Sequence, residues 1–337
     1  MFFSYHSPTV LLSLLLAFFT LSLSHPLTHE CSTRQVYDFP SNTSWLENLA
    51  VRCNGQVLAT RLDVPQLYQI DPIAQHPKPE LIYTFPEALG ALGIVELPGQ
   101  TDVFAVGVGN FSLATVTSTP GTYSIWRVDM RPISPAVSKY ADIPPASFIN
   151  GMVSLAAEQH ALLVSDSTLG NVWRFDLQTG AYTVAIEDAL MKKVSPAVAE
   201  GINGIRLFGR YLYFVNSYGP FLARVPIHAN GTKAGKGEIV AYSLDKRSFD
   251  DFAIDDDGTA YVATGTGNSV TRITPDGKVN VIAGSLNSTE IASPTSVALG
   301  RTPEDRRTLY VTTGGGLEGP INGTVILGAQ LVAVDLT

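Results

Sequence analysis

Charged residues, histidine and cysteine are all scarce in this chain of 337 residues. Only 15% of the residues are charged, and 30 acidic against 22 basic side chains give a net charge of −8. A negative chain is poorly suited to nucleic acid or an anionic membrane surface, so we expect neither as a partner. The hydrophobic fraction of 45% allows a large core. All-β folds often exceed about 150 residues as one domain, so a single domain is compatible with this length.

The usual catalytic signatures are also missing. His76, His160 and His228 fall in loops or turns and do not share a repeat position, which argues against a lactonase built on a histidine dyad. The sequence contains no Gly-x-Ser-x-Gly nucleophile elbow, no phosphate-binding loop and no dinucleotide fingerprint. These absences leave serine-nucleophile and nucleotide chemistry without support.

The amino-terminal segment predicts export. Residues 1–24 contain no Lys, Arg, Asp or Glu, residues 10–23 are almost all apolar, and Ser22 and Ser24 provide small residues at the cleavage site. This pattern is typical of a secretory signal peptide, which leaves residues 25–337 as the mature domain. A retained membrane anchor is the alternative, but the apolar run is shorter than the roughly 20 residues that span a bilayer. We expect a protein of the secretory pathway, secreted or vesicular, with no membrane contact after cleavage.

Two further features agree with export. Cys31 and Cys53 are the only cysteines, and in an oxidising compartment such a pair predicts one disulfide, with two unpaired buried thiols as the alternative. Five Asn-x-Ser/Thr sequons predict N-glycosylation. They begin at Asn42, Asn110, Asn230, Asn287 and Asn322.

Short β-rich runs separated by Gly, Asp, Asn and Pro repeat through the mature chain, which contains no convincing long amphipathic helix. The clearest copy is residues 252–263, where Asp257-Gly258 forms a hairpin turn. A repeat of about 52 residues fits a four-stranded propeller blade. The sequence therefore predicts an all-β, six-bladed β-propeller in which residues 34–39 add the outer strand to the last blade. A pair of β-sandwiches and a seven-bladed propeller are the alternatives.

Polar residues recur at matching places in four of the predicted blades, where the innermost strand begins. The innermost strands converge on a central channel, so these side chains face one another, and we predict a catalytic or binding cluster there. Carboxylates and amides are the oxygen ligands that Ca²⁺, Mg²⁺ or Mn²⁺ would prefer. The alternative is that they bond backbone groups at the blade turns. The candidates are Glu47, Asn150, Asn203 and Asp251.

The blade pattern and these four positions resemble the SMP-30/gluconolactonase/luciferin-regenerating-enzyme family. Its lactonases hold a divalent metal with a Glu, an Asn and an Asp, and a further Asn helps to bind the substrate. The resemblance implies a metal site of Glu47, Asn203 and Asp251, with Asn150 as the further Asn. The family's usual Glu-Gly-Pro is Glu47-Asn48-Leu49 here, its Asn-Asp-Gly is Asn150-Gly151-Met152, and Asp250-Asp251 leaves the register open by one residue.

The segment from Trp45 to Gly55, with the strand that ends at Thr60-Arg61, resembles the fungal secreted branch of this superfamily. Some members of that branch are hetero-Diels–Alderases, which join a quinone-methide diene to an alkene such as a macrocyclic sesquiterpene. Such a reaction needs two partners held in a dry pocket and one donor on the developing oxyanion, but no cofactor. The candidate substrate-binding aromatics are Trp45, Phe148, Tyr218 and Phe252, with a place in the core between blades as the alternative for each.

Three functions follow from these features. The preferred one is a hetero-Diels–Alderase of secondary metabolism that binds small apolar substrates. The second is a lactonase that depends on a divalent metal, and the third is a non-catalytic propeller that binds a ligand or a protein.

Overall fold

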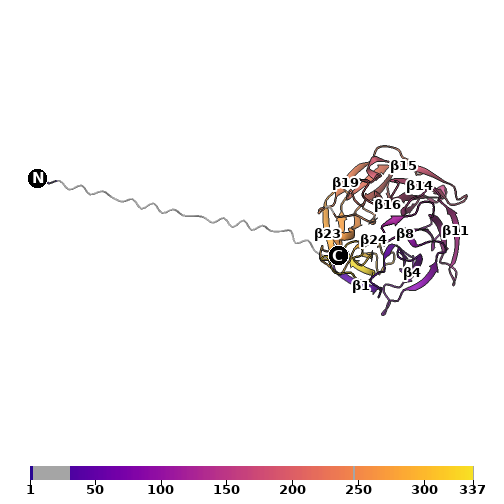
Figure 1. The fold of residues 1–337 in the computed structure, drawn as a ribbon, viewed down its shortest axis with the longest axis horizontal. Helices are drawn as coiled ribbons and strands as arrows, with labels where there is room; N and C mark the ends of the chain where they lie inside the picture. Colours follow the sequence, from indigo (N-terminus) through magenta and orange to yellow (C-terminus); the bar gives the residue numbers. More distant parts are fainter. Residues whose placement is uncertain (3–30, 246, 337) are drawn as a thin grey trace.

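The structure, a computed structural model, describes residues 1–2, 31–245 and 247–336. Six four-stranded antiparallel sheets are arranged in a ring, which confirms the predicted six-bladed β-propeller (Figure 1). The predicted signal peptide, residues 1–24, falls almost entirely outside the described residues.

The first three blades follow one another along the chain, and each begins with its innermost strand. Blade 1 contains β2 (Leu46–Val51), β3 (Val57–Arg61), β4 (Gln66–Ile70) and β5 (Glu80–Thr84); blade 2 contains β6 (Gly90–Glu96), β7 (Val103–Gly109), β10 (Ser124–Asp129) and β11 (Ala136–Asp142); blade 3 contains β12 (Ile149–Ser154), β13 (Ala161–Asp166), β14 (Asn171–Asp176) and β15 (Tyr182–Glu187).

The remaining blades complete the ring. Blade 4 contains β16 (Ile202–Phe208), β17 (Tyr211–Asn216), β18 (Phe221–Pro226) and β19 (Glu238–Tyr242); blade 5 contains β20 (Phe252–Ile254), β21 (Ala260–Ala263), β22 (Ser269–Ile273) and β23 (Val279–Gly284); blade 6 contains β24 (Pro294–Leu299), β25 (Thr308–Thr313), β26 (Gln330–Asp335) and β1 (Thr33–Asp38). A small hairpin, β8 (Phe111–Ser112) and β9 (Thr117–Ser118), extends blade 2, and the 3-10 turns are η1 (Ala157–Gln159), η2 (Ala189–Met191) and η3 (Gly265–Gly267).

Strand β1 closes the ring. It pairs antiparallel with β26, so that the amino-terminal strand forms the outer edge of the last blade, as the sequence predicts. Pairing the first and the last of the described strands in one sheet ties the ring shut.

The innermost strands of five blades carry a register shift near their start, and in blade 6 it follows Pro294. In blades 1 to 4 the register between the first two strands shifts just after the first residue of the inner strand or one residue later. A bulge of this kind re-aims the side chains within it. Glycine allows neighbouring bulges to approach, since a Cβ at Gly151 would lie 2.8 Å from the Asn203 carbonyl oxygen. The channel wall is therefore a ring of closely packed bulges.

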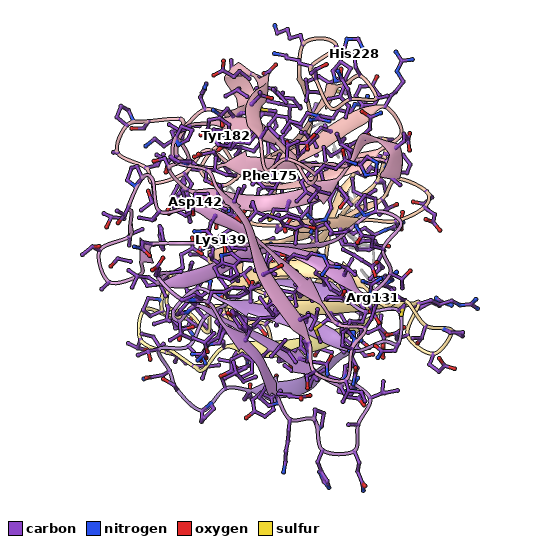
Figure 2. The ribbon with its side chains drawn as sticks, turned by 90° about the vertical axis from the view of Figure 1, so that its right-hand side faces the viewer. Arg131, Lys139, Asp142, Phe175, Tyr182 and His228 are labelled. Atoms are coloured by element: carbon purple, nitrogen blue, oxygen red, sulfur yellow. The ribbon has the colours of Figure 1, made fainter. Side chains whose placement is uncertain are left out.

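Burial falls from the inner to the outer strands. Every residue of β13 is buried, whereas β11, an outer strand, exposes Lys139 and Asp142, which form an ion pair on the side of the molecule (Figure 2). His228 projects from a surface loop, as the sequence predicts (Figure 2). The core consequently lies between the faces of adjacent blades, as expected for a propeller.

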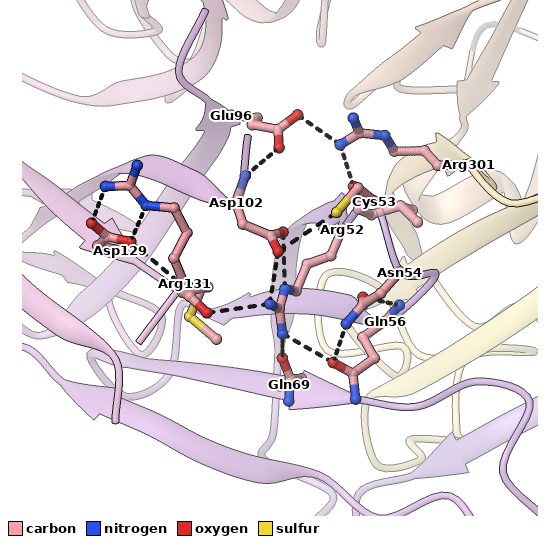
Figure 3. A network of polar contacts seen from close by, with 12 residues as sticks. Arg52, Cys53, Asn54, Gln56, Gln69, Glu96, Asp102, Asp129, Arg131 and Arg301 are labelled. Atoms are coloured by element: carbon pink, nitrogen blue, oxygen red, sulfur yellow. Dashed lines mark hydrogen bonds and ion pairs between the residues drawn. The ribbon is translucent and has the colours of Figure 1, made fainter. Parts of the chain in front are cut away.

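A polar network joins blades 1, 2 and 6 at one end of the channel (Figure 3). The guanidinium of Arg52, which follows the innermost strand of blade 1, donates to both carboxylate oxygens of Asp102 at 3.1 and 2.9 Å. Glu96 accepts from the Asp102 amide at 2.8 Å and from Arg301 of blade 6 at 2.7 Å. Because these contacts cross the junction where the ring closes, they fasten the first blades to the last.

The predicted disulfide is wrong. Cys31 and Cys53 are both free thiols. The Cys31 amide bonds the Ile282 carbonyl at 2.7 Å on the outer strand of blade 5, while the Cys53 thiol lies 3.6 Å from Asp102 in the inner turn of blade 1. Although close in the sequence, the two cysteines belong to different parts of the ring because β1 is part of the last blade.

Among the described residues, no helix is long and apolar enough to cross a membrane.

Candidate functional site

Unpaired polar atoms mark one end of the channel. We call this end the mouth: it is where the innermost strands begin, at Leu46, Ile149 and Ile202. Among the described residues, every buried side-chain oxygen or nitrogen that lacks a hydrogen-bond partner belongs to a residue of this end. A buried polar group without a partner is costly, so such a concentration indicates a place for water or a ligand. These residues are Asn110, Asn150, Ser167, Asn171, Asn203, Ser248 and Ser293.

A cavity of about 480 Å³ opens at the mouth. We call it the mouth cavity; its lining includes Ser217, Tyr218, Arg247, Ser248, Thr266 and Glu318, from loops of blades 4, 5 and 6. A larger space of about 810 Å³ lies at the other end, between blades 5 and 6, and exposed Arg306 and Arg307 line it. Within the described ranges, no unpaired buried polar atom belongs to the lining of that larger space. The mouth cavity is therefore the better candidate for a ligand site.

The structure places three of the predicted residues in equivalent bulges. Glu47, Asn150 and Asn203 are 5%, 2% and 3% exposed, and each follows the first residue of an innermost strand. The Trp45 indole donates to Glu47 Oε2 at 2.6 Å. Burial, and after it the charges of Glu200 and other carboxylates, raise the pKa of Glu47 to about 8, against the lowering effect of the Trp45 bond. The repeat thus locates equivalent buried positions in blades 1, 3 and 4.

Asp251 is differently placed from these three. Its Oδ2 accepts from Asn48 Nδ2 at 2.8 Å and from the Arg206 guanidinium at 3.0 Å, and its Oδ1 accepts from the Phe252 amide at 2.7 Å. The Ser296 hydroxyl adds a further bond at 3.3 Å. A carboxylate already paired with arginine and held by three other donors connects blades 1, 4, 5 and 6 and has little capacity left for a ligand. Asp251 thus has a structural bonding role, but mainly to side chains of other blades rather than to the backbone groups that the sequence offered as the alternative.

Asp250, the neighbouring residue, takes part in an acidic cluster that the sequence did not reveal. Burial raises the pKa of Asp250 well above its ordinary value, and the charges of Glu47, Glu200 and Glu318 raise it further. Glu318 is exposed at the rim of the cavity, and desolvation by the surrounding protein, followed by the charge of Glu200, raises its pKa above the ordinary value. We call Glu47, Glu200, Asp250 and Glu318 the mouth carboxylates. In the described part of the chain, none of them forms an ion pair with lysine, arginine or histidine.

Of the four aromatic candidates, only Tyr218 lines the mouth cavity. Its side chain is 41% exposed, and burial together with the charge of Glu200 raises the pKa of its phenol to about 12. The remaining three are buried. Phe148 stacks on Phe111 with ring centroids 4.5 Å apart, Phe252 is fully buried, and Trp45 is 8% exposed and packs in the core while it holds Glu47. Their predicted contact with substrate therefore has no support from the geometry.

The oxygen ligands at the mouth fit a divalent cation only in part. The unpaired amide oxygens of Asn150 and Asn203 and the carboxylates of Glu47 and Asp250 are hard oxygen ligands of the type that Ca²⁺ or Mg²⁺ prefers. However, no three His, Cys, Asp or Glu residues of the described chain gather closely enough to hold a metal by themselves. A cation would have to rely on the amides, with Asp250 in place of Asp251.

Two of the missed residues left faint signals. Glu200 lies three residues before Asn203 in a loop rich in Ala and Pro, and Glu318 follows the run Gly314-Gly315-Gly316 in the last blade. The sequence alone could have indicated that Glu200 and Glu318 are single acidic residues in loops at the mouth end of the channel. Their approach to carboxylates of other blades could not be predicted, because the loop path decides it.

The fold and the mouth define a six-bladed β-propeller with a polar, ligand-sized cavity at one end of its channel. Within this class, the profile of the SMP-30/Gluconolactonase/LRE-like region matches residues 197–315, so the resemblance to these propellers stands. Among solved structures, a luciferin-regenerating enzyme superposes with a TM-score of 0.64 at 13% identity, covering 90% of this chain and 95% of its own. A calcium-binding regucalcin from Agrobacterium tumefaciens superposes with a TM-score of 0.60 at 17% identity and the same coverage. At these identities the likeness establishes the fold.

Two proteins are similar in sequence over most of the chain. One, from Sarocladium schorii, is named as a candidate hetero-Diels-Alderase; it is 27% identical over 313 residues, which cover 83% of this chain and 77% of that protein. The other, from a Phoma species, carries the same kind of name and is 26% identical over 306 residues, which cover 83% of this chain and 86% of its own. The chain is thus similar to proteins named as enzymes.

Proposed function

We propose that this protein is an enzyme that binds an oxygenated small molecule in the mouth cavity and catalyses a hetero-Diels–Alder cycloaddition between a quinone-methide diene and an alkene. The observation that carries the proposal is the Tyr218 phenol, a hydrogen-bond donor on the wall of a 480 Å³ cavity. The similarity to two proteins named as candidate hetero-Diels-Alderases supports it. The mouth is more polar than two hydrocarbons would require, which suits a diene that carries oxygen.

The mechanism needs binding and orientation rather than acid–base chemistry. A carbon–carbon and a carbon–oxygen bond form together in the cycloaddition, and no group leaves, so no proton has to be transferred. Holding both partners at contact distance replaces a bimolecular step by an effectively unimolecular one. The quinone-methide carbonyl oxygen gains negative charge in the transition state, and in this proposal the Tyr218 phenol donates a hydrogen bond to it. With a pKa of about 12, this phenol keeps its proton throughout the physiological pH range.

The first test replaces the donor. We expect Tyr218→Phe to lower the rate of enzymatic cycloaddition about 100-fold, the usual effect of losing one donor to a developing oxyanion. The reaction would contain purified protein, a quinone-methide precursor and a macrocyclic sesquiterpene, and the rate and stereoisomer ratio of the adduct would be compared with the background reaction. Tyr242→Phe, on an exposed outer-strand tyrosine, is the matched control and should leave both unchanged. An adduct yield and isomer ratio equal to background with wild-type protein would refute the proposal.

A second candidate, hydrolysis of a lactone with a divalent cation, rests on the unpaired amide oxygens of Asn150 and Asn203 beside the mouth carboxylates. Glu47, Asn150, Asn203 and Asp250 would hold such a cation, which polarises the carbonyl of a lactone when bound. Opening of a lactone panel that EDTA abolishes and Ca²⁺ or Mn²⁺ restores, without any effect on adduct formation, would favour this candidate.

We also propose that the protein enters the secretory pathway, and the sequons provide a test. Asn42, Asn230, Asn287 and Asn322 are exposed, whereas Asn110 is half-buried. We expect glycans at some or all of the four exposed sites and none at Asn110. Peptide mass spectrometry of protein from a fungal host, before and after enzymatic deglycosylation in heavy-oxygen water, measures each occupancy. A glycan at Asn110 would contradict the structure there, and a complete lack of glycans would contradict export.

A further inference from the structure

Glu200 holds the side chain of Asn203 in one orientation. It lies in the loop between η2 and β16, and its Oε2 accepts from Asn203 Nδ2 at 3.1 Å. The same oxygen accepts from the Ser217 hydroxyl at 3.3 Å, while Ser217 Oγ accepts from Asn203 Nδ2 at 3.0 Å. Since the Ser217 hydroxyl donates its hydrogen bond to Glu200, it can only accept a hydrogen bond from the Asn203 amide. These three side chains form a closed triangle of hydrogen bonds.

The triangle fixes what Asn203 offers to a ligand. An amide NH₂ group has two hydrogens, and both are used within the triangle. The amide cannot flip without facing its carbonyl oxygen toward the carboxylate of Glu200. Its Oδ1 is therefore left as an acceptor, and this atom is buried without a partner among the described residues, in the side chain of a residue that is only 3% exposed. The geometry leaves one unfilled acceptor in blade 4.

The neighbouring blade repeats this feature. Asn150 occupies the equivalent bulge of blade 3 and is 2% exposed, and within the described part of the chain its Oδ1 also lacks a partner. The two bulges are in contact, since a Cβ on Gly151 would lie 2.8 Å from the backbone carbonyl oxygen of Asn203. Two adjacent blades thus each leave an unfilled acceptor at the mouth, and a group that satisfies either one must donate a hydrogen bond.

We infer that Glu200 is a positioning residue that fixes the Asn203 carbonyl as an acceptor and so makes the mouth select ligands that carry a hydroxyl group, such as a phenol or an enol. The inference deepens the proposed function, on which it rests for the choice of the mouth as the substrate site. In this inference the hydroxyl group of the substrate donates to Asn203 Oδ1, and the carbonyl oxygen of the substrate accepts from the Tyr218 phenol. A hydroxylated quinone methide would satisfy both, whereas its methyl ether would leave Asn203 unpaired.

The test compares a ligand with its methyl ether in the absence of any reaction. The probes are resorcinol and 1,3-dimethoxybenzene, titrated into the full chain with EDTA present and followed by protein NMR shifts. We expect the wild-type protein to prefer resorcinol by about tenfold or more, because the ether leaves a buried acceptor unfilled. In Glu200→Gln the new amide can donate as well as accept, so Asn203 is free to flip. The preference should then fall to about twofold or less.

Two comparisons separate positioning from folding. Ser217→Ala removes the second acceptor of the triangle and should weaken the preference in part, and Glu187→Gln, on an exposed carboxylate of β15, should leave it unchanged. The melting temperature of each variant shows whether the fold is intact, and a merely structural role for Glu200 would not alter the ratio of the two affinities. An unchanged ratio in a folded Glu200→Gln protein would overturn the role of Glu200. Equal binding of both probes to the wild type would overturn hydroxyl selection. A hydroxyl preference without cycloaddition would uphold this inference and reject only the proposed reaction.

Discussion

Asp251→Ala should lower the free energy of unfolding by about 3–5 kcal/mol, the usual cost of removing one partner from a buried ion pair. Asp251 is 1% exposed and accepts from Asn48, Arg206 and Ser296, which belong to three other blades. Its removal leaves a partly buried guanidinium without its carboxylate and a buried amide without its acceptor. Because the contacts of Asp251 span half of the ring, the loss should appear in global unfolding rather than in one loop.

Denaturant titration of metal-free protein measures this change, and the control lies a few residues away in the same segment. Asp256 is exposed, and Asp256→Ala should alter stability by less than about 0.5 kcal/mol. The competing idea is that Asp251 is a metal ligand, as the family resemblance implies. Under that idea, Asp251→Ala would leave the metal-free protein nearly as stable as the wild type and would abolish the stabilisation that added Ca²⁺ gives. Such a result would contradict the structural role.

The fold could be predicted because it depends on features that repeat. Each blade needs the same alternation of strands and turns, and a turn such as Asp257-Gly258 is visible in the sequence; Gly258 indeed adopts a positive φ of 87°. The closing strand could be predicted as well, since β-rich residues 34–39 precede the first complete blade. Confirmed elements of this kind are local in sequence or repeated along it.

The site could be predicted only where it follows the repeat. Glu47, Asn150 and Asn203 occupy equivalent bulges, so a count of residues within the blades locates them. The choice between Asp250 and Asp251 depends on Asn48 and Arg206 in other blades, and no local pattern reports these contacts.

The predictions that the structure does not support have different causes. Cys31 and Cys53 are separated because the chain ends meet in the last blade. Phe252 directly follows Asp251, so strand alternation turns it into the core. Phe148 lies in the loop before β12 and is buried by stacking on Phe111.

Glu47→Gln should make the protein more stable at high pH and leave it nearly unchanged at low pH. Burial and the neighbouring carboxylates raise the pKa of Glu47 from its ordinary 4.5 to about 8. The folded state therefore holds a proton that the unfolded state releases between these two values, and the stability of the wild type falls as the pH rises through this window. The substituted glutamine side chain cannot ionise, yet it can still accept from the Trp45 indole. With EDTA present, we expect the variant to exceed the wild type by on the order of 4 kcal/mol at about pH 8.5, and by less than about 1 kcal/mol at about pH 4.5.

Denaturant midpoints across this pH range measure the crossover, with Glu304→Gln on an exposed turn as the control that should follow the wild type throughout. The coupling among the mouth carboxylates gives a second signature. The charge of Glu47 raises the pKa of Asp250, so Glu47→Gln should also lower the pKa of Asp250. The stability of the variant should then depend less on pH than the removal of the Glu47 titration alone would explain. If added Ca²⁺ flattens the wild-type profile and not that of Glu47→Gln, the cluster binds the cation and the hydrolytic candidate gains support. Parallel pH profiles for the two proteins, with and without Ca²⁺, would show that Glu47 is ionised at neutral pH and that the mouth is more open to water than the structure indicates.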